Sequence, residues 1–474
     1  MNSDWVKYLA KLEEEIAGDI WCNCEAYKNL VIMCDRFGSR FALTEGERLA
    51  RDYIAEKFKE YGLENVSVEP FQYYGWKRGK ASLEVLEPFE KEIPTISLVL
   101  SPPTPPGGLE GEVIYLGSGS PDEFKAKKEE IEGKIVLCSS ATSPDGKRYH
   151  RRTKYGYAVE YGAIGFIFMN HNPGKLPPTG SLRPAYRMAG EIPAIGISKE
   201  DGDFIVRNMK GGRLRVRIIN ESQIVPNATS WNVVGEIIGS KYPDDIIVLG
   251  GHYDGHDISQ GATDNCSGVV SVMEVARALA KHKGSFKRTI RFIAFGAEEL
   301  GVTGSTCYVD QHKDEIPLFN MMINVDGDGR FIRQNFEVHG PEELVPYLQK
   351  IADDIGYPMN VKTTLSTASD HWPFYLEGVP AASLESVPDP MLEPLIRSMG
   401  RGWGHTPADT VDKVDPRALK EASLVLSQFL IRIANEEEFP IKHTDKKKIL
   451  RYLEEKGVAE RLRIQKKWHP ESIR

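Results

Sequence analysis

The chain of 474 residues is longer than one hydrophobic core usually supports, so we expect two domains. With 41% hydrophobic and 27% charged residues the composition is that of a soluble globular protein, and the net charge of −8 argues against a general nucleic-acid-binding surface. No apolar run approaches about 18 residues, so we expect no membrane-spanning helix.

The six cysteines are scattered along the chain and do not form the pattern of a disulfide framework. The N-terminal sequence MNSDWVKYLAKLEEEIAGDI is charged and amphipathic, without the basic-then-apolar order of a signal peptide. A reducing, cytoplasmic setting is therefore the default expectation.

The first part of the chain predicts one helix followed by strands. Apolar residues recur at helical spacing in EGERLARDYIAEKFKEYG, and Gly62 ends that helix. VSVEPFQYY and KASLEVL are typical of strands, and the Pro- and Gly-rich SPPTPPGGLEG predicts a linker. We assign residues 1–105 to the N-terminal part of the main domain.

A block of short elements follows. GEVIYLG, GKIVLCSS, IGFIFMN and IPAIGIS predict strands, and YAVEYGA between them predicts a helix. We expect residues 106–230 to form a small inserted domain that is α/β or rich in strands.

From Trp231 onward buried strands alternate with helices. The strands DIIVLGG, TIRFIAFG, NMMINVD and VPAASLES show no polar alternation, and VVSVMEVARALA and ALKEASLVLSQFLIRIA have helical spacing. This pattern predicts an α/β fold with a mostly parallel central sheet and helices on both faces, over residues 231–435. Residues 436–474 predict a charged helical extension. In such sheets ligands bind beyond the carboxyl ends of the strands.

Polar side chains follow the first of these strands. In GGHYDGHD, His252 is a candidate metal ligand, and Asp254 could accept its second ring N–H and so fix the tautomer. Taken alone, such an H-x-D pair is more often structural. Asp264 follows in a loop before a helix, where a role as helix N-cap is equally open.

Two adjacent carboxylates, Glu298 and Glu299, follow the apolar strand TIRFIAFG. Adjacent carboxylates repel unless a cation or a shared proton relieves them, although a surface strand end could hold both in water. Asp326 closes the next strand, after MMINV, and His405 lies in a Gly-rich loop further along.

Together these residues supply two imidazoles and several carboxylates, all predicted at one edge of one sheet. Nitrogen and oxygen ligands without cysteine suit catalytic Zn²⁺, with Co²⁺ or Mn²⁺ as substitutes. The set is large enough for two ions if one carboxylate bridges them, and the spare glutamate would then serve as general base. The sequence therefore predicts a two-metal hydrolytic site.

The order of these fragments resembles that of the M28 family of zinc exopeptidases. The resemblance implies an aminopeptidase-like hydrolase with two zinc ions. In this sequence one ion would be held by His252 and Asp326 and the other by Glu299 and His405, with Asp264 bridging.

By the same resemblance Glu298 would be the general base, and Asp254 would orient His252. The likeness extends from Leu30 to about Ile433. The segment from about Gly111 to Glu221 is similar to a protease-associated (PA) domain, through GKIVL and YGAIGFIFMN.

One position departs from the family pattern. Several aminopeptidases of the family have a tyrosine before the last histidine, where this chain has Gly404. The oxyanion role then falls to Trp403, to another group such as His371, or to the metal ions. The fragment SDHWPF, with Asp370 and His371, also resembles a family feature near the substrate site, and a loop that hydrogen-bonds to itself is the alternative.

The expected function is removal of N-terminal residues from short peptides, with the PA-like insert roofing the cleft. His256 and Asp257 resemble a longer H-x-D-x-x-D form of dipeptidase-like and carboxypeptidase-like branches, so those activities are the alternative. They would need a cation to bind a C-terminal carboxylate, and the candidates are Arg330, Arg397 and Arg401.

Two other functions stay open on this fold. One is a glutaminyl cyclase-like acyl transfer. The other is a metal-free receptor or scaffold, like the transferrin receptor-like relatives of the family. We expect peptides as partners, with neither nucleic acid nor membrane, and the sequence is compatible with a homo-oligomer.

Overall fold

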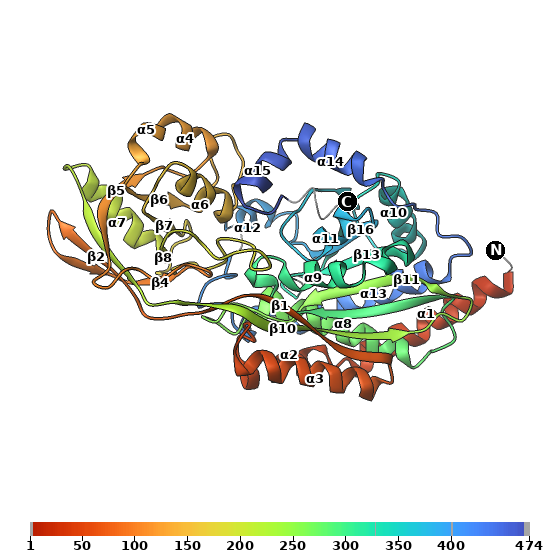
Figure 1. Cartoon of the computed structure of the whole chain (residues 1–474). Helices are drawn as coiled ribbons and strands as arrows, with labels where there is room; N and C mark the ends of the chain where they lie inside the picture. Colours follow the sequence, from red (N-terminus) through yellow and green to blue (C-terminus); the bar gives the residue numbers. More distant parts are fainter. Residues whose placement is uncertain (1–2, 328, 400–401, 469–474) are drawn as a thin grey trace.

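The computed structural model describes residues 3–327, 329–399 and 402–468. Figure 1 shows two parts side by side, each built around one sheet. The chain leaves the first part after β1 (Glu64–Lys77) and returns to it through β10 (Gln223–Ile237). None of the described helices is long and apolar enough to cross a membrane.

The sheet of the first part has eight strands in the order β1-β10-β12-β11-β13-β16-β14-β15. Its four central strands, β12, β11, β13 and β16, run parallel, while β1 with β10 on one side and β14 on the other pair antiparallel. The bounds of the strands not yet given are β11 (Tyr242–His252), β12 (Arg288–Phe295), β13 (Phe319–Val325), β14 (Gln334–His339), β15 (Lys362–Thr363) and β16 (Ala381–Ser386). The structure confirms the α/β fold with a mostly parallel central sheet.

Helices cover both faces of this sheet. One face carries α1 (Ser3–Asn23), α2 (Ala26–Phe37), α3 (Glu45–Tyr61), α8 (Ser267–Ala280), α10 (Leu344–Asp354) and α13 (Pro416–Asn435). The other face carries α9 (Thr303–Gln311) and α11 (His371–Leu376). Helix α3 ends as predicted, because Gly62 has a φ of 83°, in the left-handed region that favours glycine.

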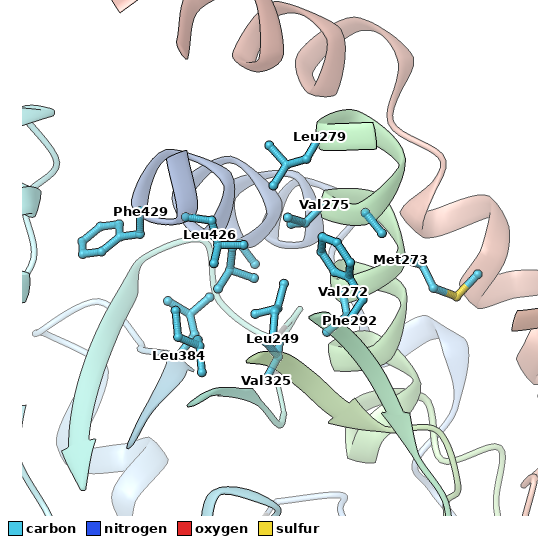
Figure 2. Packing of buried hydrophobic residues seen from close by; sticks show 14 of the residues in the cluster. Leu249, Val272, Met273, Val275, Leu279, Phe292, Val325, Leu384, Leu426 and Phe429 are labelled. Carbon is cyan, nitrogen blue, oxygen red and sulfur yellow. The ribbon is translucent and has the colours of Figure 1, made fainter. Parts of the chain in front are cut away.

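The side chains of β11 show how the core is divided. Ile247 and Leu249 pack into the cluster beneath α8 and α13, whereas Ile246 and Val248 pack on the opposite face against residues of α9 and α11. Successive side chains of a strand point to opposite faces, so an uninterrupted apolar run is buried on both. Figure 2 shows the first of these clusters, with Leu249 among its labelled side chains.

The second part contains another eight-stranded sheet, in the order β3-β2-β9-β5-β6-β7-β8-β4, in which β5, β6, β7 and β8 are parallel. Its strands are β2 (Ala81–Glu87), β3 (Lys91–Ile93), β4 (Thr95–Ser97), β5 (Leu109–Tyr115), β6 (Ile135–Ser139), β7 (Gly165–Met169), β8 (Ala194–Ile197) and β9 (Arg215–Asn220). Its helices are α4 (Pro121–Ala126), α5 (Lys128–Ile131), α6 (Arg151–Glu160) and α7 (Lys199–Met209).

The C-terminal extension forms α14 (Lys446–Glu455) and α15 (Val458–Ile464), and α12 (Glu393–Met399) precedes the loop of His405. Leu453 of α14 and Leu462 of α15 pack in one cluster with Trp372 and Tyr375 of α11. In Figure 1, α15 lies where the two parts of the molecule meet, so the extension contacts both.

Candidate metal centre

The predicted site residues follow strands that end at the same edge of the first sheet. His252 is the last residue of β11 and pairs with Phe295 at the end of β12. Gly250 of β11 is level with Asn324 of β13, which places Asp326 level with His252. Glu298 and Glu299 follow β12 in a short 3₁₀ turn.

His252, Asp264 and Asp326 form a first group of donors, whose ligand atoms all lie within 4.8 Å of one another. The Nε2 atom of His252 is 3.6 Å from Oδ1 of Asp264 and 3.6 Å from Oδ1 of Asp326. The hydroxyl of Ser369 donates to Oδ2 of Asp326 at 2.6 Å and so fixes that carboxylate.

Glu299, His405 and His256 form a second group, and all three side chains are buried. Oε2 of Glu299 is 3.3 Å from Nε2 of His405 and 2.9 Å from Nε2 of His256. Sequence reasoning gave no metal role to His256. Its position two residues after Asp254, in HYDGH, is the signal that could have pointed to it.

Asp264 lies between the two groups. Its Oδ1 faces His252, as given above, and its Oδ2 is 3.3 Å from Nε2 of His405. Ligand atoms about 2.0 Å from a tetrahedral zinc ion are roughly 3.3 Å apart, which is close to the separations found in both groups.

Asp254 connects His252 to the glutamate turn. One carboxylate oxygen accepts the backbone N–H of Glu298 at 3.1 Å, and the other accepts that of Glu299 at 3.2 Å. Nδ1 of His252 donates to the Asp254 carbonyl at 3.1 Å, and it lies 3.3 Å from the Asp254 carboxylate. Ala297, directly before the turn, has a φ of 53°, a strained conformation that these bonds hold in place.

The donor set fits a metal ion. Nδ1 of His252 donates to a carbonyl oxygen, so Nε2 is the ring nitrogen available to a metal ion, and it faces two carboxylates. Nε2 of His252 and Oε1 of Glu299 are buried without a hydrogen-bond partner in the described part of the chain. Leaving a buried nitrogen or oxygen lone pair without a partner is energetically costly, and a cation bound by each group would provide that partner.

Glu298 stands apart from both groups and has the chemistry of an acid–base residue. Burial, together with the neighbouring Glu299 carboxylate, raises the pKa of Glu298 well above its ordinary value, although His252 opposes this shift. A carboxyl in this state can exchange protons nearer to neutral pH than a surface glutamate can.

One further residue, to which sequence reasoning gave no role, fixes the loop that presents Asp264. Asp409 accepts the N–H of Thr263 at 2.8 Å, its hydroxyl at 2.7 Å, and the N–H of Asp264 at 3.1 Å. Its place in GHTPADT, four residues after His405, was the available signal.

Asn265 joins the strand ends beneath the site. Its amide nitrogen donates to the carbonyls of His252 at 3.3 Å and Val325 at 2.9 Å, and its amide oxygen accepts the N–H of Gly327 at 2.9 Å. Asn265 therefore sets the spacing between β11 and the residues after β13.

The two candidate residues of the SDHWPF fragment, Asp370 and His371, have different surroundings in the structure. Asp370 is buried, and burial raises its pKa to about 7. His371 points its ring at other partners: Nε2 donates to the Ser366 carbonyl at 3.1 Å, and the ring stacks on His339 with centroids 3.8 Å apart. Neither residue belongs to the two donor groups.

The structure describes the side chain of only one of the three candidate arginines. Arg330 lines a pocket that reaches Asp264 and Asp326. The side chain of Arg397 and the whole of Arg401 lie outside the described residues. Trp403, proposed for the oxyanion, has the ammonium group of Lys413 5.4 Å from its ring centroid.

Comparison with known protein families identifies the class of each domain. Residues 232–430 match the model of peptidase family M28, and residues 95–205 match that of the PA domain. Residues 232–430 are therefore a peptidase M28 domain and residues 95–205 a PA domain, the two resemblances expected from the sequence.

Particular relatives cover most of the chain. It is 28% identical to carboxypeptidase Q of Bos taurus over 422 residues, which are 87% of this chain and 86% of the relative. The crystal structure of a peptidase M28 precursor from Shewanella amazonensis SB2B superposes with a TM-score of 0.78 at 25% identity, covering 93% of this chain and 100% of that one. BSAP, a zinc aminopeptidase from Bacillus subtilis, gives a TM-score of 0.68 at 26% identity, covering 87% and 95%.

Proposed function

We propose that this chain is an aminopeptidase that holds two zinc ions and removes the N-terminal residue from short peptides. The observation that carries the proposal is the position of Asp264, whose two carboxylate oxygens face His252 and His405 respectively. A carboxylate so placed can bridge two cations, as in co-catalytic hydrolases. The likeness to the zinc aminopeptidase of B. subtilis supports the choice of metal and reaction.

In this proposal the two donor groups divide the ligands between the ions. His252 and Asp326 hold one ion, Glu299 and His405 hold the other, and Asp264 is shared. Zinc, when bound, supplies a Lewis acid that polarises the scissile carbonyl and makes water more acidic.

Glu298 is the general base in this proposal. It accepts a proton from the attacking water and later passes that proton to the leaving amine. Asp254 keeps Glu298 in place by accepting its backbone N–H.

The pocket beside the donors supports recognition of an amine. Beside the proposed metal ligands Asp264 and Asp326, its wall contains Glu385 and Arg330. Carboxylates in a partly buried pocket attract the positive charge of a free α-amine.

Metal analysis and a panel of blocked peptides test the proposal. We expect two zinc equivalents per chain, and cleavage of a free dipeptide that N-acetylation abolishes while the C-amidated dipeptide remains a substrate. Cleavage of the acetylated dipeptide would overturn the aminopeptidase assignment. A protein that binds no metal and cleaves nothing would instead be a receptor or scaffold.

A carboxypeptidase or dipeptidase is the second candidate, and two observations favour it. Arg330 lines the same pocket and offers a cation to a C-terminal carboxylate, and one of the relatives is named carboxypeptidase Q. A carboxypeptidase would cleave the N-acetylated peptide and fail on the amidated one, so the same panel separates the two activities.

A further inference from the structure

Arg78 lies where the chain leaves the peptidase part, directly after β1, and its guanidinium contacts both parts of the molecule. Figure 1 shows the chain passing from β1 to β2 across this junction. The next residue, Gly79, runs against the returning segment, since a Cβ there would lie 2.2 Å from the carbonyl oxygen of Glu221. On the other side of Arg78, the ring centroid of Trp76 is 4.8 Å from the guanidinium carbon. These contacts on both sides fix the position of the arginine.

On the peptidase side, Arg78 forms a bidentate ion pair with Asp257. Its Nε donates to one carboxylate oxygen at 2.7 Å, and its Nη2 donates to the other at 2.6 Å. Both side chains are mostly buried, with 18% of the arginine and 16% of the aspartate exposed. Two parallel hydrogen bonds fix the direction of a carboxylate as well as its distance. Neither donor group includes Asp257, whose partner is this arginine.

On the PA side, the same guanidinium binds two segments. Nη1 donates to the carbonyl oxygen of Ser97, at the end of β4, and Nη2 donates to the hydroxyl of Thr179 at 3.2 Å. The hydroxyl of Thr179, a fully buried residue, in turn donates to the Ser97 carbonyl at 3.2 Å. Arg78 therefore joins two segments of the PA part to each other and to the loop of Asp257.

Both partners of Arg78 lie next to an imidazole of the second donor group. Asp257 directly follows His256, whose Nε2 is 2.9 Å from Oε2 of Glu299. Thr179 donates its backbone N–H to the carbonyl oxygen of His405, whose Nε2 also faces Glu299. One guanidinium thus restrains, from opposite sides, both histidines that contact Glu299.

The first donor group is held by different contacts. His252 is the last residue of β11, and its place is set by the pairing of that strand. The hydroxyl of Ser369 fixes the Asp326 carboxylate. Loss of the arginine should therefore affect one metal ion more than the other.

We propose that Arg78 is a positioning residue for the second donor group: through Asp257 and Thr179 it sets the places of His256 and His405. By this route the PA domain takes part in binding one of the two metal ions. The role rests on the proposed two-zinc function and adds to it a residue that touches neither ion. Residues that orient metal ligands typically contribute about 10- to 100-fold to metal affinity.

Titration with buffered free zinc tests this role in Arg78→Met and Asp257→Asn. We expect two equivalents in the native protein. In each variant one equivalent should bind at the native midpoint, and the other should need about 10- to 100-fold more free zinc. The double variant should lose no more affinity than Arg78→Met alone, because the two substitutions remove the same ion pair.

Arg432→Met is the matched control. Arg432 makes a bidentate pair of the same kind with Glu13, at 2.7 Å and 3.0 Å, and joins α13 to α1. The two side chains are 28% and 11% exposed, which is similar to the Arg78 pair. Loss of this pair should lower the melting temperature but leave both zinc midpoints at their native values.

Native zinc midpoints in Arg78→Met and Asp257→Asn would overturn the positioning role and leave the proposed function standing. Equal weakening of both ions would also overturn it, because that pattern indicates a general loss of structure. If Arg78→Met fails to fold, Asp257→Asn and Arg78→Lys carry the decision, since lysine keeps the charge but cannot form the bidentate pair. A native protein that binds no zinc would overturn the proposed function, and this role with it.

Discussion

The backbone N–H of Thr179, in the PA part, donates to the carbonyl oxygen of His405 at 2.9 Å. In return, Nδ1 of His405 donates to the Thr179 carbonyl at 3.3 Å, across 226 positions of sequence. His405 has a φ of 60°, which an L residue adopts only when its surroundings hold it. A residue of one domain therefore holds the proposed ligand of the other.

Gly180→Ala should disturb this contact. Gly180 has a φ of 132°, and a Cβ there would lie 2.1–2.4 Å from the guanidinium atoms of Arg151, which donates to the Thr179 carbonyl. We expect kcat/KM to fall by about a hundredfold, the scale of a misplacement of roughly 1 Å. Gly174→Ala is the control, with a φ of 116° but only Leu176 at 3.7 Å; equal losses in both variants would refute the contact's role.

Glu298→Gln should separate chemistry from metal binding. The amide keeps the shape of the side chain but cannot accept the proton, so we expect kcat to fall by about 10²- to 10⁴-fold with zinc content near the native level. Glu299→Gln is the comparison, because loss of that carboxylate should lower the zinc content itself. Unchanged turnover in Glu298→Gln would exclude it as the base.

Asp264→Asn should release both metal ions together. Its two oxygens face different donor groups, and the neutral amide offers one good acceptor in place of two charged ones. We expect the zinc content to fall well below one equivalent per chain at the metal concentration that saturates the native protein. Retention of one full equivalent would contradict a bridging role.

The stability of the fold should fall as the pH drops from about 6.5 toward 4. Burial lowers the pKa of His339 to about 4, and burial with the adjacent His339 lowers the pKa of His371 well below its ordinary value. Between these pH values each histidine is protonated in the unfolded chain but stays neutral in the folded protein. Each histidine therefore lowers the free energy of unfolding by about 1.4 kcal/mol for every unit by which the pH falls.

Denaturant unfolding of the native protein and of His339→Gln measures this effect. The variant removes one of the two titrations, so its unfolding free energy should depend less steeply on pH between 6.5 and 4. Parallel curves for the two proteins would show that the stacked pair does not contribute. At pH 8 neither histidine is charged in either state, and this linkage contributes nothing there.

The sequence predicted the central strands because they are buried on both faces and therefore lack polar residues. It predicted the position of the site for a related reason: polar residues directly after such strands have to lie at the carboxyl edge of the sheet. It did not predict β14, whose side chains alternate in burial, or the start of β10, where Pro226 and Asn227 interrupt the apolar pattern. Asn227 has a φ of 57°, which local propensity does not anticipate within a strand.

By itself, then, the sequence determined most of the candidate site residues, because residue type and spacing relative to a strand are local properties. The tertiary structure alone decided how they combine. It placed His256 against Glu299, turned the two oxygens of Asp264 toward different partners, and brought Thr179 to His405. These contacts join segments that are far apart in the chain, and side-chain directions across such distances are set by packing and not by local pattern.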